Sequence, residues 1–288
     1  MGPVAQMDSR GDGKSGVGED LTIPIVKVKG LTRRFGDFTA VDGIDLEVRA
    51  GEVFGLLGPN GAGKTTTIKM LVTLLPASGG TASVGGYDIG RQADYVRRLL
   101  GYVPQALSAD GNLTGYENLQ VFAKLYDVPR SEQKRRIEEA LEFMGITDAA
   151  KRMVRTYSGG MVRRLEIAQT LIHRPRVLFL DEPTIGLDPV ARRAVWNHLE
   201  DLRERYGTTL FITTHYMEEA EELAHRVAIM NRGKIVALDT PEGLMAQVGR
   251  EDGATLEDAF AHFTGGSLEE GGTYKDVRSA RRTAGRLR

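Results

Sequence analysis

The first part of the chain alternates between apolar and polar positions, which is the two-residue period of half-buried strands. Three stretches follow this period between turns that contain glycine: residues 25–28, 38–41 and 44–48. They predict a β-rich segment at the beginning of the fold. A continuous apolar run at 53–57 then predicts a buried strand. After it, apolar residues recur at helical spacing until Pro76 stops the run, which predicts a helix.

The middle of the chain changes to a helical period. Thr114 and Glu117 form a capping-box pair, and Gly145 is placed to end a second helix. Because this stretch interrupts the alternation of strands and helices, it predicts a helical subdomain inserted in an α/β core. From Ser158 the alternation returns and continues through two strands, several helices and a hairpin.

These patterns divide the chain into four segments: a leader (1–22), an α/β domain (23–240) with its helical subdomain at about 106–157, a C-terminal helical extension (241–264) and a basic tail (265–288). The leader is rich in Gly, Ser and Asp and has few apolar residues, so we expect it to be disordered. The arginine-rich tail is either a solvated disordered segment or a contact with a regulatory or membrane partner, and its composition does not decide between them.

Composition narrows the possible functions. With 41% hydrophobic and 27% charged residues, the 288-residue chain resembles an ordinary globular protein. Its net charge of −1 gives no global electrostatic reason to bind nucleic acid, so we expect no nucleic-acid partner. The absence of cysteine excludes disulfides and thiolate metal sites. No apolar run approaches the ~20 residues that cross a bilayer, so a role at a membrane would require a partner protein.

Candidate chemistry centres on residues 58–67, which read Gly-Pro-Asn-Gly-Ala-Gly-Lys-Thr-Thr-Thr. The stretch follows the predicted buried strand and opens the predicted helix, which is the setting that a phosphate-binding loop requires. Glycines let successive N–H groups face a polyphosphate, Lys64 would reach the β- and γ-phosphates, and the Thr65 hydroxyl would ligate Mg²⁺. The simpler interpretation, a glycine-rich turn with an incidental lysine, is disfavoured by these flanks. The expected nucleotide contacts are Gly58, Pro59, Asn60, Gly61, Ala62, Gly63, Lys64, Thr65 and Thr66.

Two further motifs extend this interpretation. Asp181 and Glu182 end the apolar run 177–180, where the first carboxylate suits Mg²⁺ and the second could polarise an attacking water as general base. Ser158-Gly159-Gly160 opens a predicted helix and exposes N–H groups and a hydroxyl to an anion. In isolation this second motif is better explained as a plain helix cap, and its position before the acidic pair is what favours phosphate binding.

The order of these motifs, together with Gln105, Leu187-Asp188 and His215, resembles the ATP-binding subunit of an ABC transporter. The resemblance extends over about residues 25–239. It implies the ABC ATPase fold, an α/β P-loop NTPase core with an antiparallel β subdomain and an inserted α-helical subdomain. It also implies that the chain is an ATP hydrolase that uses ATP and Mg²⁺, with an integral membrane permease as partner. Such a subunit would be peripheral, at the cytoplasmic face of the cell membrane.

The resemblance implies roles for residues within one subunit. Gln105 would sense Mg²⁺ and the permease, and would act in catalysis with Glu182. His215 would be the switch that contacts the γ-phosphate, whereas the other four histidines are expected to serve packing or the surface. Asp181 would complete the metal site, and Phe35 would stack on adenine in place of the commoner tyrosine.

The resemblance also implies a homodimer. Ser158, Gly159 and Gly160 would form the signature that closes on ATP held by a second ATPase subunit, and Asp188 would lie in the loop that crosses the interface. The usual signature begins with Leu and ends in Gln, whereas here Tyr157 and Met161 occupy these ends. We expect ATP closure to survive this departure and any effect to fall on local helix packing.

Within the family, several segments resemble the ATPase subunits of bacterial drug exporters of the daunorubicin-resistance type: residues 38–46, 63–75, 215–220 and 256–260. Export of hydrophobic drugs is therefore the expected function. The alternative is an exporter subunit for another cargo, such as lipid, polysaccharide or a haem-related compound. A DNA-repair ABC ATPase would carry a long coiled coil between Gln105 and Ser158, and a translation-associated one would carry two cassettes, so both are disfavoured.

Overall fold

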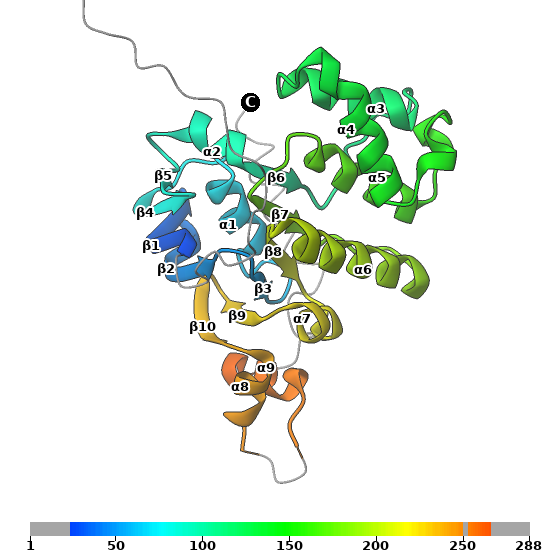
Figure 1. Ribbon diagram of the computed structural model, residues 1–288. Coiled ribbons are helices and arrows are strands. Elements are labelled where there is room, and N and C mark those ends of the chain that lie inside the picture. Colours follow the sequence, from blue (N-terminus) through cyan, green and yellow to red (C-terminus); the bar gives the residue numbers. More distant parts are fainter. Residues whose placement is uncertain (1–23, 250–252, 266–288) are drawn as a thin grey trace, which may run out of the picture.

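The computed structural model describes residues 24–249 and 253–265. The predicted leader (1–22) lies outside these residues, as does the predicted basic tail (265–288) except for Gly265. Figure 1 shows a central α/β core with a small β sheet on one side, a group of helices on the other, and two short helices at the base.

The small sheet is antiparallel and has the strand order β2-β1-β4-β5. Its strands are β1 (Pro24–Phe35), β2 (Phe38–Arg49), β4 (Gly79–Val84) and β5 (Tyr87–Asp88). The stretches predicted as two strands on either side of Gly43 form the single strand β2. Gly43 has a positive φ of 62°, and the pairing of β2 with β1 shifts register near it, so the chain passes the glycine through an irregularity rather than a turn.

The core sheet has the order β10-β9-β3-β8-β7-β6 and is parallel except for the β9–β10 hairpin. Its strands are β3 (Val53–Leu57), β6 (Leu100–Val103), β7 (Val177–Asp181), β8 (Thr209–Thr214), β9 (Arg226–Asn231) and β10 (Lys234–Asp239). Every residue of β3, β7 and β8 is buried, as expected for parallel strands that are covered on both faces.

Helix α1 (Lys64–Leu71) packs with both sheets, and its apolar residues belong to the same core cluster as those of β1 and β2. The sequence pattern predicted that this helix would continue toward Pro76. Instead Thr73 adopts a left-handed conformation (φ 64°), and the N–H groups of Leu74 and Thr73 donate to the carbonyls of Lys69 and Met70. This Schellman-type closure ends the helix before the proline can.

The helical insertion lies between β6 and β7, following the short α2 (Ala93–Leu99) that precedes β6. It contains α3 (Gly115–Leu125), α4 (Arg130–Phe143), the 3₁₀ turns η1 (Thr147–Ala149) and η2 (Val154–Thr156), and α5 (Gly159–Leu171). The predicted capping box at Thr114 and Glu117 is present at the start of α3. Apolar residues of α3, α4 and α5 share one cluster with those of β7 and β8, so α5 joins the insertion to the core.

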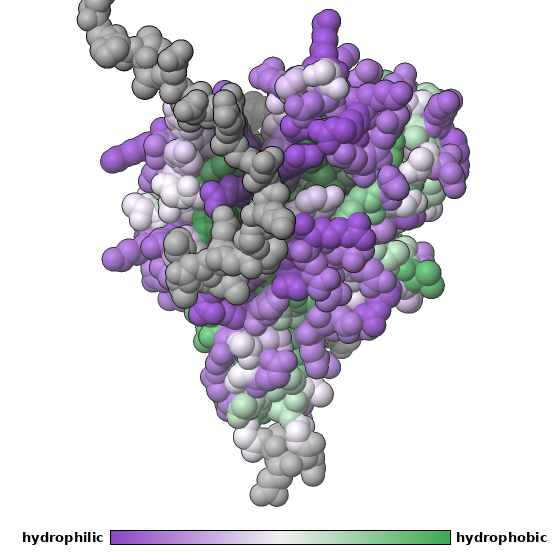
Figure 2. Space-filling view, viewed as in Figure 1, coloured by the Kyte–Doolittle hydropathy of each residue, from purple (hydrophilic) through white to green (hydrophobic). Residues whose placement is uncertain are grey.

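The remaining helices complete the core. Helices α6 (Pro189–Tyr206) and α7 (Met217–Leu223) pack against β8, and α8 (Pro241–Ala246) and α9 (Leu256–Thr264) enclose a third apolar cluster with β9. The face in Figure 2 is largely hydrophilic, with small separate hydrophobic areas. Within residues 24–249 and 253–265, no helix is both long and apolar enough to span a membrane.

Candidate functional site

The register of the core sheet brings the predicted motifs to one edge. Leu57, at the end of β3, pairs with Thr214, and Asp181, at the end of β7, pairs with Thr213. Val103, at the end of β6, pairs with Leu180 in the same direction. Since parallel strands finish at a common edge, the segments that follow these strands gather at their carboxyl ends, where open α/β sheets bind ligands.

The loop between β3 and α1 is held tightly on one side. A Cβ atom at Gly58 would lie 2.3 Å from the carbonyl oxygen of Met230, and one at Gly63 would lie 2.5 Å from that of Ala40. Gly63 also has a φ of 110°, and Gly61 has a φ of 84° with no atom near its vacant Cβ position. Only glycine fits at positions 58 and 63, where neighbouring backbone carbonyls come close. At Gly61 the loop faces open space.

Helix α1 begins at this loop without a side-chain cap and with no acidic residue in its first turn. The first N–H groups of α1 are therefore free to bind a ligand in the loop, and the positive end of the helix dipole lies at the same place. This is the arrangement that binds phosphate groups. The loop and the helix start fit a polyphosphate.

Lys64 is the first residue of α1, and its side chain is almost completely buried. The ammonium donates hydrogen bonds to the carbonyl oxygens of Gly58 (2.7 Å) and Pro59 (3.2 Å) and lies 3.1 Å from the Oε1 atom of Glu182. Burial lowers the pKa of Lys64, and the carboxylates of Glu182 and Asp181 oppose this shift. The loop carbonyls and Glu182 thus hold the positive charge of Lys64 against the phosphate loop.

The predicted metal ligands Thr65 and Asp181 are in contact. The Thr65 hydroxyl donates to Oδ1 of Asp181 at 3.1 Å, and the hydroxyl of Thr213 donates to the same oxygen at 2.6 Å. Among the described residues there is no group of three or more acidic, His or Cys side chains that could hold a metal. A hydroxyl and one carboxylate fit Mg²⁺, which binds nucleotide sites through few protein oxygens, water and substrate phosphates.

Three predicted residues converge on the carboxylate of Glu182. Lys64 and the Nδ1 atom of His215 lie 3.1 Å and 3.3 Å from Oε1, and the Gln105 amide donates to Oε2 at 3.0 Å. The His215 contact is close, although its geometry is not that of a hydrogen bond. The three partners come from α1, the segment after β6 and the segment after β8, so the strand register assembles the cluster.

Glu182 occupies an unusual position. Its φ is 48°, in the left-handed region that a residue with a side chain adopts at a cost of about 1–3 kcal/mol. Its N–H donates to both the carbonyl and the hydroxyl oxygen of Thr213, which secures this conformation. Burial alone would raise the pKa of Glu182, but His215 and Lys64 together hold that pKa below its usual value. The carboxylate is therefore ionised.

The predicted signature and interface residues lie apart from this cluster. Ser158 caps α5 by accepting from the Met161 N–H at 3.3 Å, and Asp188 caps α6 by accepting from the Ala191 N–H at 2.9 Å. Ser158, Gly159 and Asp188 are exposed. A Cβ atom at Gly160 would lie 2.9 Å from that of Ala191, so this glycine also has a packing reason. Within one subunit these residues act as caps and contacts between helices.

The unusual Tyr157 before the signature has a defined contact. Its hydroxyl donates to the carbonyl oxygen of Ala149 at 2.6 Å and lies where a Cβ atom of Gly115 would be. Met161, at the other end of the signature, lies in the first turn of α5 and is partly buried. The tyrosine thus ties the start of α5 to α3 and η1, which a leucine could not do through a hydrogen bond.

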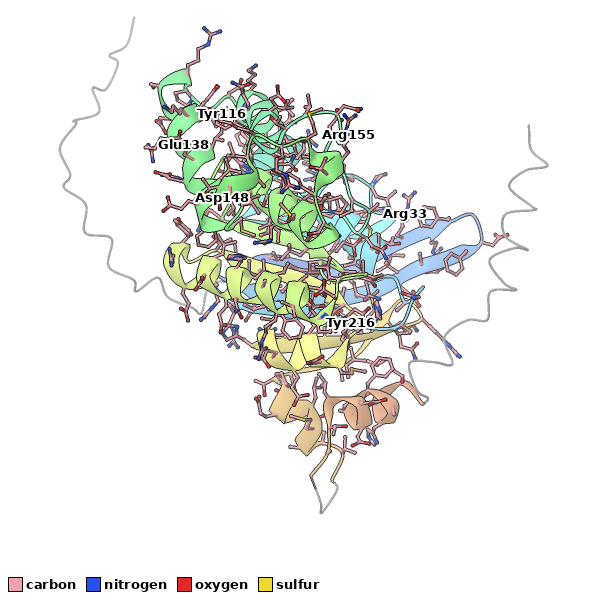
Figure 3. All side chains as sticks on the ribbon, turned by 90° about the vertical axis from the view of Figure 1, so that its right-hand side faces the viewer. Arg33, Tyr116, Glu138, Asp148, Arg155 and Tyr216 are labelled. Atoms are coloured by element: carbon pink, nitrogen blue, oxygen red, sulfur yellow. The ribbon has the colours of Figure 1, made fainter. Side chains whose placement is uncertain are left out.

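Phe35 ends β1 and is 46% exposed. The guanidinium of Arg33 lies 4.5 Å from the centre of its ring, a cation–π contact that the sequence did not suggest. Figure 3 shows Arg33 on the side of the small sheet, away from Tyr116 and Glu138 of the helical insertion. Phe35 thus lies half-exposed at the tip of the β1–β2 hairpin, and it does not contact the Glu182 cluster.

Sequence reasoning missed several buried polar residues around the site. Thr213 holds both Asp181 and Glu182, and Glu219 accepts hydrogen bonds from the Thr184 hydroxyl and the Trp196 indole, each at 2.9 Å. Burial raises the pKa of Glu219. The available signal was the pair of threonines that ends the buried strand β8 and a glutamate on the inner face of a short helix.

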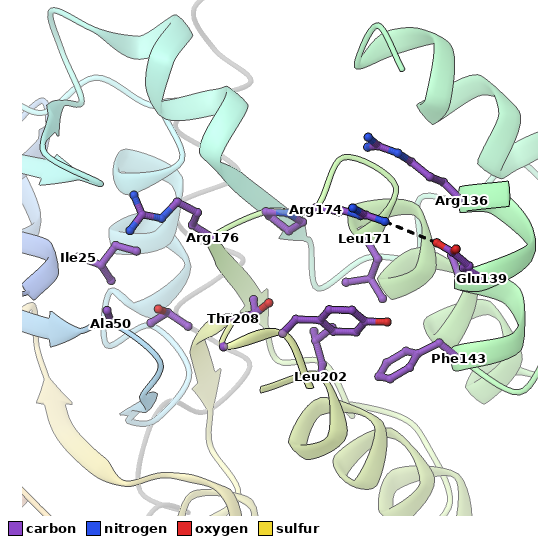
Figure 4. A pocket seen from close by; sticks show the side chains of 15 residues that line it. Ile25, Ala50, Arg136, Glu139, Phe143, Leu171, Arg174, Arg176, Leu202 and Thr208 are labelled. Carbon is purple, nitrogen blue, oxygen red and sulfur yellow. Dashed lines mark ion pairs between the residues drawn. The ribbon is translucent and has the colours of Figure 1, made fainter. Parts of the chain in front are cut away.

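A separate hollow of about 300 Å³ lies at the opposite edge of the core sheet, near the amino ends of β7 and β8 (Figure 4). Its lining includes Arg136 and Phe143 of α4, together with Arg176 immediately before β7. None of the predicted site residues lines it. The hollow is thus distinct from the cluster at the carboxyl ends of the strands.

The sequence profile of the ABC transporter family matches residues 41–185. The daunorubicin resistance ATP-binding protein DrrA2 of Streptomyces coeruleorubidus is 46% identical over 224 residues, which are 78% of this chain and 69% of that protein. The Nod factor export ATP-binding protein I of Ralstonia nicotianae is 43% identical over 222 residues, 77% of this chain and 69% of that protein.

A solved structure of the ATP-binding subunit of an ABC transporter superposes with a TM-score of 0.74 at 27% identity. The match covers 83% of this chain and 99% of that one. These similarities confirm the predicted α/β fold class, with its antiparallel β subdomain and helical insertion, and they confirm the predicted family.

Proposed function

The chain belongs to the ABC transporter family, whose ATP-binding subunits hydrolyse ATP to drive transport, and we propose that it powers a separate permease that exports hydrophobic antibiotics. The observation that supports this proposal most is the convergence of Lys64, Gln105 and His215 on the ionised carboxylate of Glu182. A phosphate-binding loop, a carboxylate base and two polar sensors then share one site.

In the proposed reaction, the loop from Gly58 to Thr66 and the start of α1 bind the phosphates of ATP. Lys64 exchanges its contacts with loop carbonyls for contacts with phosphate oxygens. Glu182 accepts a proton from the attacking water, a role for which it must be ionised, and His215 and Gln105 orient the groups around it. Thr65 and Asp181 would hold Mg²⁺, which neutralises the charge on the phosphates.

We propose that the complete site requires two copies of the chain. Ser158, Gly159 and Asp188 are exposed and do not contact the Glu182 cluster within one subunit. The exposed start of α5 offers N–H groups to an anion, so ATP bound by one copy can be closed over by the signature of the other. Phe35 would stack on the adenine of the bound nucleotide.

The permease completes the proposed assembly. The described part of the chain has no membrane-spanning helix, and Leu107, two residues after Gln105, is 55% exposed. An exposed apolar residue beside a residue at the catalytic site is suited to transmit nucleotide binding to a partner. The subunit would then act at the cytoplasmic face of the membrane as a peripheral protein.

The Glu182→Gln variant tests the assignment of the base. Gln keeps the size of the side chain but cannot accept a proton, so turnover should fall at least about 100-fold while MgATP binding persists. Turnover should be measured by phosphate release and binding by quenching of Trp196, which is the single tryptophan of the chain. Turnover close to that of the wild type would overturn the assignment.

A second experiment tests the two-copy site. Turnover per subunit should rise with protein concentration, because each signature completes a site on another copy. A monomer verified by light scattering should bind ATP but hydrolyse it slowly. Turnover that does not change with concentration in a verified monomer would contradict the proposal.

Identifying the exported cargo requires the permease. The similarity to the Nod factor export protein, nearly as high as that to the daunorubicin resistance protein, makes another exported cargo the second candidate. Co-purification of the permease, followed by ATPase assays with hydrophobic antibiotics and with lipids or oligosaccharides, separates the two. Stimulation by antibiotics alone would favour drug export, and stimulation only by the other compounds would favour the alternative.

A further inference from the structure

Arg163 of α5 has a fully buried side chain, although arginine is seldom buried without partners. Its guanidinium donates to the carbonyl oxygens of Pro104 (2.7 Å) and Gln105 (2.9 Å). It also donates to the Oε2 atom of Glu166, one turn further along α5, at 3.0 Å. The arginine therefore binds the backbone of the very residue whose side chain reaches Glu182.

Glu166 is equally buried and binds the other end of the same loop. Its Oε1 atom accepts hydrogen bonds from the N–H and the hydroxyl of Ser108 and from the N–H of Ala109. Arg163 and Glu166 thus form a clamp on the loop before and after its exposed residue Leu107.

Both residues of the clamp belong to α5, the helix that begins with the signature. Arg163 lies five residues after Ser158, which is about 7.5 Å along a helix at 1.5 Å per residue. A helix moves as a rigid element, so a displacement of the Gln105 loop would carry the exposed N-terminus of α5 with it.

Stability alone does not explain a buried ion pair of this kind. Replacing such a pair by apolar residues of similar volume is often neutral or stabilising, whereas removing one partner is costly. The atoms of the pair that face the loop bind its backbone or the Ser108 hydroxyl. This favours a role in orienting the loop.

We propose that Arg163 and Glu166 are positioning residues that couple the Gln105 loop to the start of α5, so that the contact of Gln105 with Glu182 and the presentation of the signature to a second copy change together. This inference rests on the proposed function. In the resulting picture, a change at the γ-phosphate is sensed by Gln105 and is passed through two buried side chains to the surface that the other subunit meets.

The test separates positioning from stability with the double variant Arg163→Met/Glu166→Met, which removes the clamp but fills its volume. The unfolding temperature and the MgATP affinity measured through Trp196 should stay close to those of the wild type. The turnover number should fall about tenfold or more, because misplacement by 1 Å can reduce a rate by about 100-fold. The protein concentration for half-maximal turnover should rise as well.

The matched control is the Glu52→Met/Arg226→Met variant, which removes an ion pair of 3.5 Å between a buried glutamate and a partly buried arginine outside this region. It should retain the turnover number. If the Arg163/Glu166 double variant also retains its turnover number within twofold, the coupling role is overturned. If that variant does not fold, Arg163→Lys takes its place: Lys keeps the charge beside Glu166 but lacks the planar fork of donors with which Arg163 spans the two carbonyls and the carboxylate. Turnover should again fall at unchanged affinity, and unchanged turnover overturns the role.

Wild-type protein is assayed first in every series. Absence of MgATP hydrolysis in the wild type would contradict the proposed function itself. Normal hydrolysis in the wild type with normal turnover in the clamp variants would contradict the coupling role alone.

Discussion

The ammonium of Lys64 and the carboxylate of Glu182 form a contact of 3.1 Å in which both side chains are about 95% buried. The pair joins the phosphate loop to the end of β7 across the site. Because each charge compensates the other away from water, the loss of one partner should leave the other uncompensated.

A double-mutant cycle measures this coupling. Lys64→Met should lower the free energy of unfolding by about 3–5 kcal/mol, since it leaves the Glu182 carboxylate buried without its cation. Adding Glu182→Gln should recover part of this loss, with a coupling of about 1–3 kcal/mol in urea unfolding. The exposed pair Arg193–Glu222, at 2.6 Å, is the control and should show a coupling below about 1 kcal/mol. Additive effects at Lys64 and Glu182 would contradict the electrostatic description.

The Thr65 hydroxyl provides a test of the proposed metal site. Thr65→Val keeps the shape of the side chain but removes the oxygen that lies beside Asp181. Binding of ATP without Mg²⁺ should change little, whereas the gain in affinity on adding Mg²⁺ should shrink about tenfold, because one hard oxygen ligand is lost. Thr65→Ser is the matched control and should retain the gain. An equal effect of Mg²⁺ on Val and Ser variants would argue against Thr65 as a ligand.

Much of the site could be predicted because its signals are local. The phosphate loop is recognisable from ten consecutive residues, and Asp181 and Glu182 follow a continuous apolar run that marks a buried parallel strand. Strand ends then converge by topology, so the contact of Gln105 with Glu182 follows once both strands are parallel neighbours of the same sheet.

The remaining features depend on contacts between distant segments. Arg163 and Glu166 look like ordinary charges of a surface helix in the sequence, and only the packing of α5 against the Gln105 loop buries them. The merging of two predicted strands into β2 depends on register with β1. The early end of α1 depends on a left-handed Thr73, which no residue-type rule indicates.

Tyr157 allows a prediction about the unusual signature. Tyr157→Phe removes the hydrogen bond to Ala149 and should lower the free energy of unfolding by about 1 kcal/mol. Gly115→Ala should cost about 1–3 kcal/mol, because the new Cβ would lie 2.3 Å from the Tyr157 hydroxyl. In the Tyr157→Phe background the nearest atom becomes the ring carbon Cζ at 3.3 Å, so the same Gly115→Ala change should cost less. An unchanged cost would show that the hydroxyl does not limit the space at this position.

The lowered pKa values of three histidines allow a prediction of how the free energy of unfolding depends on pH. Burial lowers the pKa values of His173, His198 and His225 below 6.5 in the folded protein. As pH falls through 6.5 the unfolded chain therefore takes up protons before the folded one does, and the free energy of unfolding should decrease from about pH 7 toward pH 5. For His173 the cause is visible: its ring stacks on Tyr126 at 3.7 Å, and its Nδ1 atom is buried without a partner.

His173→Phe isolates one part of this slope. Phe keeps the stacking on Tyr126 but cannot bond to the Leu100 carbonyl, which accepts from the Nε2 atom of His173 at 2.9 Å. The variant should be less stable at pH 7.5, and the difference from the wild type should shrink as pH falls to 5.5, because only the wild type loses stability through this histidine. Glu219 and Glu52, whose pKa values burial raises, act in the opposite direction but are common to both proteins and cancel in the difference. Urea unfolding at pH 7.5, 6.5 and 5.5 measures the effect, and a constant difference would show that His173 takes up its proton equally in both states.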